Sequence, residues 1–180
     1  MVTSGKRKLE TQKMSERQQE ITQYQEKFND VIVDIREYAG ELTVEVKAEH
    51  CKEVLKTLKE MFGYNYLSDL TSVDYYTDEL RFGVSYNLCN LDKGTRLRVT
   101  TRVEEENPEV DSVVEIWQAA NWQEREAWDM MGIRFKGHPD HRRIYMPEDF
   151  EYFPLRKEFP LIGIPGSIET PPPAPPKEYQ

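Results

Sequence analysis

The chain has 180 residues and a formal net charge of −9, from 24 Lys and Arg against 33 Asp and Glu. A chain of this size fits one domain, and its acidic balance argues against a nucleic-acid-binding surface, which needs a clustered excess of Lys and Arg. No apolar run approaches the roughly 20 residues that cross a bilayer, and the polar N-terminal stretch lacks the pattern of a signal peptide, so we expect a soluble, non-exported protein.

The N-terminal stretch, residues 1–20, is predicted to be a basic, frayed leader. Residues 1–17 hold five basic and two acidic side chains without a clear apolar stripe, and the acidic ones argue against an organelle-targeting helix. The alternative is that the leader anchors the chain to another molecule. Ile21, Tyr24 and Phe28 follow at helical spacing, which predicts a short helix packed on a core.

A β-hairpin and a helix are expected next. Two alternating runs between Val31 and Val46 predict the hairpin, with its turn at Ala39-Gly40. The alternation places Val31, Val33 and Ile35 on one face of the first strand. Residues 48–62 are predicted to form a helix, because five apolar side chains recur at intervals of three and four and Gly63 follows at the position of a C-cap.

The middle of the chain predicts a three-stranded meander. Its strand-like runs are Tyr66–Tyr76, Leu80–Cys89 and Arg96–Glu104. Turn-forming residues separate these runs. The order of strand, strand, helix and meander predicts an α+β domain over residues 21–132, with a mainly antiparallel sheet packed with helices.

A further helix closes this domain. Ser112 can cap a helix and Glu115, three residues on, completes a capping box, which predicts a helix over Val113–Met131. A break near Ala120-Asn121 is an alternative. Gly132 is expected to end the helix, because glycine readily takes the left-handed conformation of a C-cap.

The remaining residues predict an irregular, extended C-terminal segment. Residues 133–160 show little periodicity and many Gly, Pro and charged residues, so we expect an ordered stretch that packs against something. We call residues 133–160 the docking segment. Residues 161–180 include the run PPPAPP, which cannot form a core and favours polyproline II. This Pro-rich tail is either solvated or an extended arm that lies on a neighbour.

We expect no catalytic or cofactor-binding residues in this chain. Gly163 and Gly166 form the only close glycine pair, and a proline between them removes an amide that a phosphate would need, which argues against NADH or ATP binding. Two cysteines are too few for a disulfide framework, and Cys51 and Cys89 are expected to be reduced thiols. His50 beside Cys51 does not make a dyad, because adjacent residues of a helix point apart.

One turn is a candidate metal site. His138 and His141 lie close together in sequence and could bind one ion, with Asp140 or a distant Cys completing the set of ligands. No third and fourth ligand with convincing spacing is present, so we expect no bound metal. The alternative is conformational: Gly137 and Pro139 fix a bend to which His138 is hydrogen-bonded.

Charged residues are dense and nearly balanced between residues 124 and 160, with seven basic and eight acidic side chains among several aromatic ones. This composition is typical of protein interfaces, although a salt-bridged element of the same domain is an alternative. Glu124 and Glu126 point apart on a helix, while Arg125 and Asp129 are expected to pair on the surface. The candidate interface charges are Glu124, Arg125, Glu126, Asp129, Arg142, Arg143, Arg156 and Lys157.

Residues 121–160 resemble the signature of the C subunit, the 30 kDa type subunit, of proton-pumping NADH:quinone oxidoreductase, respiratory complex I. The matching blocks are Trp122–Asp129, Gly132–Pro139, Arg142–Ile144 and Pro154–Pro160. The upstream hairpin, helix and meander are also in the order of that family, so the resemblance extends over residues 20–160. His141 departs from the family, which usually has Leu at this position.

The resemblance implies a non-catalytic structural subunit of the peripheral, hydrophilic arm, at the cytoplasmic face of a bacterial inner membrane. Its implied partners are the iron–sulfur and quinone-site subunits. These would carry the iron–sulfur clusters, the flavin and the quinone, so this chain would have no cofactor of its own and would support electron transfer from NADH to quinone. The eight candidate charges would order the docking segment, some within the chain and others across the interface.

Two alternatives stay open at the level of sequence. The first is the equivalent subunit of a membrane-bound energy-converting hydrogenase or of a ferredoxin-driven complex, because the electron donor binds elsewhere in either assembly. The second, from a different class, is a free-standing metal-dependent hydrolase that uses His138, Asp140 and His141.

Overall fold

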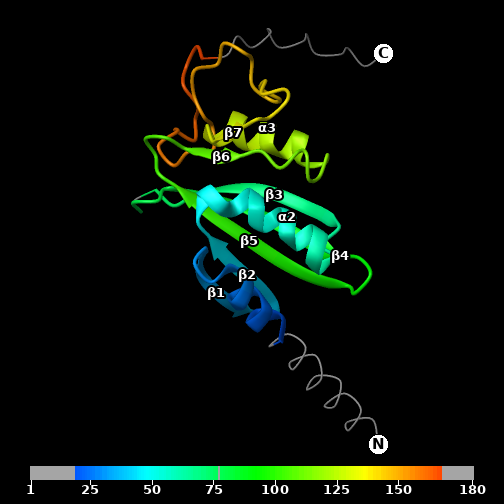
Figure 1. The fold of residues 1–180 in the computed structure, drawn as a ribbon. Helices are drawn as coiled ribbons and strands as arrows, with labels where there is room; N and C mark the ends of the chain where they lie inside the picture. Colours follow the sequence, from blue (N-terminus) through cyan, green and yellow to red (C-terminus); the bar gives the residue numbers. More distant parts are fainter. Residues whose placement is uncertain (1–18, 77, 168–180) are drawn as a thin grey trace, which may run out of the picture.

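The computed structural model describes residues 19–76 and 78–167 (Figure 1). The predictions for the leader up to residue 18 and for the Pro-rich tail from residue 168 lie outside the described residues. A helix covers residues 19–28. It buries Tyr24 and Phe28 in the core, as their spacing predicts. The hydroxyl group of Tyr24 is hydrogen-bonded to that of Tyr64 at 3.1 Å.

Five strands form one mixed sheet in the order β1-β2-β5-β4-β3. The strands are β1 (Ile32–Tyr38), β2 (Glu41–Val46), β3 (Tyr66–Asp74), β4 (Phe82–Asn90) and β5 (Thr95–Val103). β2 pairs with β5 in parallel, and the other three neighbouring pairs are antiparallel. The predicted α+β fold with a mainly antiparallel sheet is therefore confirmed.

One face of the sheet is covered by the 3-10 helix η1 (Ala48–His50) and by α2 (Cys51–Phe62) (Figure 1). Val54, Leu55 and Leu58 of α2 are buried in the core. This is the face that the spacing of three and four predicts. Helix α2 ends as expected at Gly63, whose φ of 77° gives the left-handed C-cap.

The predicted hairpin is present, but one of its apolar residues faces solvent. The register of β1 against β2 shifts between Ile32 and Asp34. Such a bulge inserts an extra residue and interrupts the alternation of faces. Val33 is consequently 58% exposed, so the prediction that Val31, Val33 and Ile35 share one face is wrong at Val33.

The helix predicted over Val113–Met131 is shorter in the structure, where α3 spans Ala120–Met131 and turns precede it. The predicted capping box does not form. Glu115 reaches a lysine of α2 at 3.2 Å instead of turning back to the main chain. The N–H of Ser112, which Glu115 would have bound in the box, donates to the carbonyl oxygen of Lys136 at 2.9 Å. The next N–H, that of Val113, donates to the carboxylate of Glu124 at 2.7 Å. A tertiary contact therefore replaces the local one that would have started a longer helix.

A second, two-stranded sheet was not predicted. It pairs β6 (Glu109–Asp111) in parallel with β7 (Arg134–Lys136). β7 lies within the docking segment, so the prediction of an irregular segment is wrong over these three residues. The chain beyond β7, yellow to orange in Figure 1, lies at the α3 end of the molecule, away from β1 and β2.

Candidate functional site

The docking segment is fixed to the rest of the chain mainly by charged side chains. Residues 137–167 contain turns and bends but no helix or strand. Their main-chain N–H and C=O groups therefore need partners other than secondary structure. Three clusters supply them, and we call these the α3 anchor (Arg125, Asp129, Arg143), the Arg156 anchor and the Asp74–Arg81 anchor.

Asp129 is the centre of the α3 anchor. Its side chain is fully buried. One carboxylate oxygen accepts the N–H groups of Ile144, Tyr145 and Met146 at 2.9, 2.6 and 2.9 Å. The other oxygen accepts from Arg143 Nη1 at 2.7 Å. Burial alone would raise the pKa of Asp129, but these donors outweigh it and hold the pKa below its usual value.

Two arginines complete the α3 anchor by donating to carbonyl groups. Arg125 donates to the carbonyl oxygens of Arg142 and Arg143 at 3.0 and 2.9 Å. Arg143 donates to the carbonyls of Phe150 and Tyr152 as well as to Asp129. The predicted surface pair of Arg125 with Asp129 is therefore wrong. Both side chains are buried, and each binds the docking segment instead of the other.

The Arg156 anchor ties the second half of the docking segment to the end of α3. Arg156 Nε donates to the carbonyl oxygen of Met131 at 2.8 Å. Its guanidinium lies over the rings of Phe153 and Phe82, at 4.5 and 4.9 Å from their centroids. Gly132 ends α3 with a φ of 78°, as the sequence predicts. A Cβ added there would lie 2.7 Å from both Arg156 Nη2 and the Phe153 ring.

Gly132→Ala is therefore expected to destabilise the chain by about 2–4 kcal/mol, which combines left-handed strain with overpacking. Gly40→Ala is the matched control. Gly40 has a similar φ of 79° but no atom within 4 Å of an added Cβ, so only strain of about 1–2 kcal/mol applies. Urea unfolding measures both variants. Equal losses would contradict close packing of the docking segment against Gly132.

The Asp74–Arg81 anchor holds the end of the docking segment. Arg81 donates through Nε and Nη2 to both carboxylate oxygens of Asp74 at 2.9 Å, and Arg81 is only 5% exposed. The N–H of Lys157 donates to Asp74 at 2.8 Å. Arg81 also binds Glu105 and Glu158. The hydrogen bonds from Arg81 hold the pKa of Asp74 far below its usual value.

Asp74 and Arg81 were missed among the candidate residues. No motif marks them, and their partner Lys157 is 83 residues from Asp74 along the chain. The one signal that could have found them was their place in the predicted meander. Asp74 ends β3 opposite Phe82 at the start of β4, so antiparallel pairing sets Asp74 beside the residue that precedes Phe82.

Five of the eight candidate charges point inward, and the other three are exposed. Glu124, Arg125, Asp129, Arg143 and Arg156 bind groups of their own chain. Glu126, Arg142 and Lys157 are exposed. The Arg142 side chain is 69% exposed and forms two hydrogen bonds with Asp140. α3 and the docking segment also carry the exposed apolar side chains Trp122, Tyr145, Tyr152 and Leu155.

The candidate metal turn uses its imidazole nitrogens for hydrogen bonds. Nδ1 of His138 accepts the N–H of Asp140 at 3.0 Å, which confirms the predicted hydrogen-bonded bend. Nε2 of His141 accepts the N–H of Phe135 at 3.1 Å. Within residues 19–76 and 78–167, no three His, Cys, Asp or Glu side chains are placed to hold one metal ion. The geometry does not favour the metal-dependent hydrolase.

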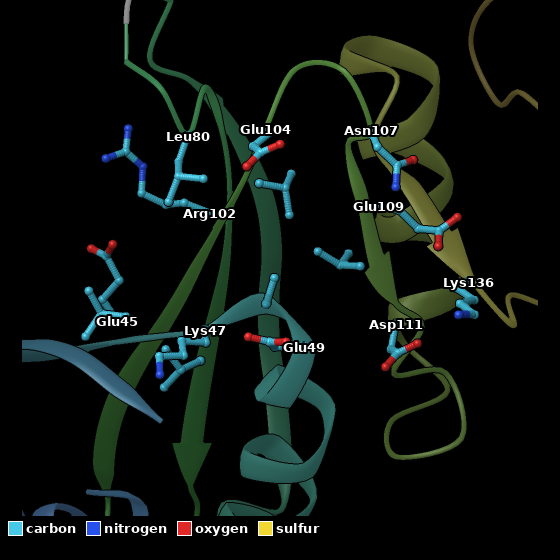
Figure 2. A pocket seen from close by; sticks show the side chains of 15 residues that line it. Glu45, Lys47, Glu49, Leu80, Arg102, Glu104, Asn107, Glu109, Asp111 and Lys136 are labelled. Atoms are coloured by element: carbon cyan, nitrogen blue, oxygen red, sulfur yellow. The ribbon is translucent and has the colours of Figure 1, made fainter. Parts of the chain in front are cut away.

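A shallow groove of about 760 Å³ runs between the main sheet and the small sheet (Figure 2). Figure 2 shows Glu109, Asp111 and Lys136 on its small-sheet side, with Glu45 and Lys47 on the opposite side. Its lining carries five acidic and three basic side chains, and the described lining includes no His, Cys or Ser.

The thiol of Cys51 is buried away from His50, and burial raises its pKa to about 12.

All three anchors fall within the match to a known protein family. The family model "Respiratory-chain NADH dehydrogenase, 30 Kd subunit" matches residues 44–164. The chain belongs to this family. Several relatives named as the C subunit of NADH-quinone oxidoreductase match most of this chain. The Citrifermentans bemidjiense protein is 43% identical over 150 residues, which cover 83% of this chain and 93% of the relative. The C 2 subunit of the Rhizobium etli enzyme is 46% identical over 158 residues, covering 84% of each chain.

Solved structures agree with the family assignment. A trypsin-resistant fragment (1-134) of Nqo5 matches with a TM-score of 0.57 and 38% identity, over 59% of this chain and 88% of the fragment. A chain of an archaeal membrane-bound sulfane sulfur reductase matches with a TM-score of 0.70, over 82% of this chain and 87% of that one. At 24% identity, the second match shows a shared fold. Both the resemblance to this family and the expected fold class are therefore confirmed.

None of the described helices has the length and apolar character to span a bilayer.

Proposed function

We propose that this chain is a non-catalytic structural subunit of the peripheral arm of a proton-translocating NADH:quinone oxidoreductase. Its relatives are named as the C subunit of that enzyme, and the docking segment supplies a surface for assembly. The partners are the iron–sulfur and quinone-site subunits, which carry the iron–sulfur clusters, the flavin and the quinone. The complex is hetero-oligomeric and places this chain at the cytoplasmic face of the bacterial inner membrane.

The observation that carries this proposal is the division of the docking segment into an inner and an outer side. The anchors bind main-chain groups from the inner side and fix the course of the backbone. The outer side keeps charges such as Arg142 and apolar side chains such as Tyr145, which is 61% exposed, and Leu155, which is 55% exposed. An ordered surface that mixes Arg with aromatic and aliphatic side chains is typical of the centre of a protein interface.

Inner and outer charges therefore have separable roles. The inner charges, such as Asp129, stabilise the isolated chain, because each leaves a buried partner unpaired when it is removed. The outer charges, such as Glu126 and Arg142, contribute to recognition of the partners. A variant of an outer charge is expected to fold normally and to assemble poorly.

Charge reversal at Glu126 and Arg142 tests this proposal. We expect E126K/R142E to lower the amount of complex that co-purifies with this subunit by about fivefold or more, since like charges facing each other across an interface are unfavourable. Quinone reductase activity per membrane should fall in parallel, while the unfolding midpoint of the isolated chain stays close to wild type. Quantitative mass spectrometry of the purified complex measures the first effect.

Lys56→Glu is the matched control for that experiment. Lys56 is an exposed cation on α2, with 62% of its side chain exposed, and it lies on neither α3 nor the docking segment. Normal assembly in K56E shows that a reversed charge as such is tolerated. The proposal fails if E126K/R142E assembles normally, and a collapse of turnover in that normally assembled complex would indicate a catalytic role.

A further inference from the structure

Glu124 has a buried carboxylate in which only one oxygen accepts a hydrogen bond from the described residues. It lies on α3, and its side chain has no exposed surface. Oε1 accepts the N–H of Val113 at 2.7 Å. Oε2 has no hydrogen-bond partner among the described residues. Nε2 of His138 lies 3.9 Å from Oε2, on a side chain that is also fully buried.

The ring of His138 is neutral in this arrangement. Its Nδ1 accepts the N–H of Asp140, so that nitrogen carries no proton. The single ring proton is then on Nε2, which lies 3.1 Å from the carbonyl oxygen of Asn121 and can donate to it. Oε2 of Glu124 therefore faces a neutral imidazole, and no cation on the turn compensates a buried negative charge.

The surroundings of Glu124 reinforce this imbalance. Lys52 from α2 and Tyr86 from β4 interact electrostatically with Glu124, and Cys51 from α2 and Asp111 from β6 interact with Tyr86. Asp140 and His141, from the turn of His138, contact the His138 ring. The ammonium group of Lys52 favours the carboxylate, but it is already paired with Glu115 at 3.2 Å. Burial raises the pKa of Glu124 from 4.5 to about 7 against the opposing effects of Val113, Ser112 and Lys52.

We propose that Glu124 is a reversible proton-binding site, in which a proton from solvent binds Oε2 beside His138 and the turn of residues 137–141 closes over the neutral acid. Only an O–H bond forms in this step. In the ionised state the carboxylate needs water, and opening the turn that holds His138 would admit it. Gly137 and Pro139 of this turn are exposed, whereas Val113, which donates to Oε1, is buried.

The sign of the linkage follows from the raised pKa. The closed turn holds the proton up to pH about 7, whereas an opened, hydrated Glu124 loses it near pH 4.5. Closing is therefore favoured fully below pH 4.5, and this advantage is lost as the pH rises from 4.5 to 7. The ratio of open to closed turn therefore increases by up to about tenfold per pH unit between these two pH values and stays constant above them.

Two measurements on the full chain test this proposal. In protein labelled with ¹³C at Glu, the Glu124 carboxyl resonance should titrate with a midpoint about 7 rather than 4.5. The protection factor of the Asp140 N–H, measured by hydrogen exchange, should fall by up to about tenfold per pH unit from pH 4.5 to 7. In E124Q it should stay flat, because glutamine keeps an acceptor for Val113 but cannot ionise.

E126Q is the matched control, because Glu126 is an exposed glutamate on the same helix, and in the isolated chain its Glu124 midpoint and Asp140 protection factor should equal those of wild type. The proposal is overturned by a Glu124 midpoint near 4.5, by a flat Asp140 protection factor in wild type, or by equal pH dependence in wild type and E124Q. The Glu124 carboxyl resonance is assigned through its correlations to the backbone and needs no variant. Its titration therefore tests the proposal even if E124Q fails to fold. Neither measurement involves partner subunits, so the outcome is separate from that of the proposed function.

Discussion

Asp129→Ala is expected to destabilise the isolated chain by about 3–5 kcal/mol. The substitution removes one carboxylate that serves three N–H groups of the docking segment and Arg143. All of these donors lose a partner at once, and the Arg143 guanidinium is left partly buried without its counter-charge. Breaking a buried ion pair by deleting one member costs far more than the intact pair contributes.

Urea unfolding of the full chain measures this loss, with Glu126→Ala as the control. Glu126 is on the same helix but exposed, so its removal should change the free energy of unfolding by less than about 0.5 kcal/mol. Limited trypsinolysis gives an independent readout, because D129A should be cleaved faster after Arg142 and Arg143. A loss below about 1 kcal/mol in D129A would contradict the central place of the α3 anchor.

Arg81→Met removes the Asp74–Arg81 anchor and is expected to lower the free energy of unfolding by about 3–5 kcal/mol at neutral pH. Methionine keeps the unbranched, apolar part of the side chain but leaves the fully buried carboxylate of Asp74 without its bidentate partner. It also releases Glu158 in the docking segment. Arg98→Met is the control, because Arg98 and its partner Glu41 are 41% and 50% exposed, and such a pair contributes less than about 1 kcal/mol.

Acid unfolding distinguishes this effect from a general loss of packing. Because Arg81 lowers the pKa of Asp74, the pair stabilises the native state fully above the usual pKa of 3.8. That contribution is lost as the pH falls below 3.8 towards the native pKa. The free energy of unfolding of R81M should therefore vary less with pH below 3.8 than that of wild type and R98M. Equal slopes in R81M and wild type would contradict the assignment.

The sequence predicted those parts of the fold in which local patterns and tertiary packing agree. The spacing of Val54, Leu55 and Leu58 places α2 on the sheet, and Gly63 and Gly132 end their helices in the left-handed conformation. The meander strands were found within about two residues, because each combines β-forming residues with a turn signal. Local and global preferences that point to the same structure make a segment predictable.

The failures occur where the structure is decided by groups distant in sequence. The capping box at Ser112 is sound locally, but the N–H of Ser112 donates to the carbonyl oxygen of Lys136, Glu124 accepts the N–H of Val113, and the helix begins at Ala120. β6 and β7 are three residues each, too short to show alternation. The partners of Arg125 and Asp129 are main-chain groups of the docking segment, which no side-chain pattern encodes. The Asp74–Arg81 anchor was missed for another reason: it joins side chains from β3, the start of β4 and the docking segment, which no local motif connects.

The anchors bind backbone atoms, and this has a consequence for how the outer surface can vary. Ile144, Tyr145 and Met146 are held through their N–H groups, which every residue except proline possesses. The side chain at an exposed position such as 145 can therefore be exchanged without changing the path of the chain. A few buried charges determine the path of the backbone, whereas the exposed side chains can change together with those of a partner protein. The segment is thus a natural position for engineering new binding specificity.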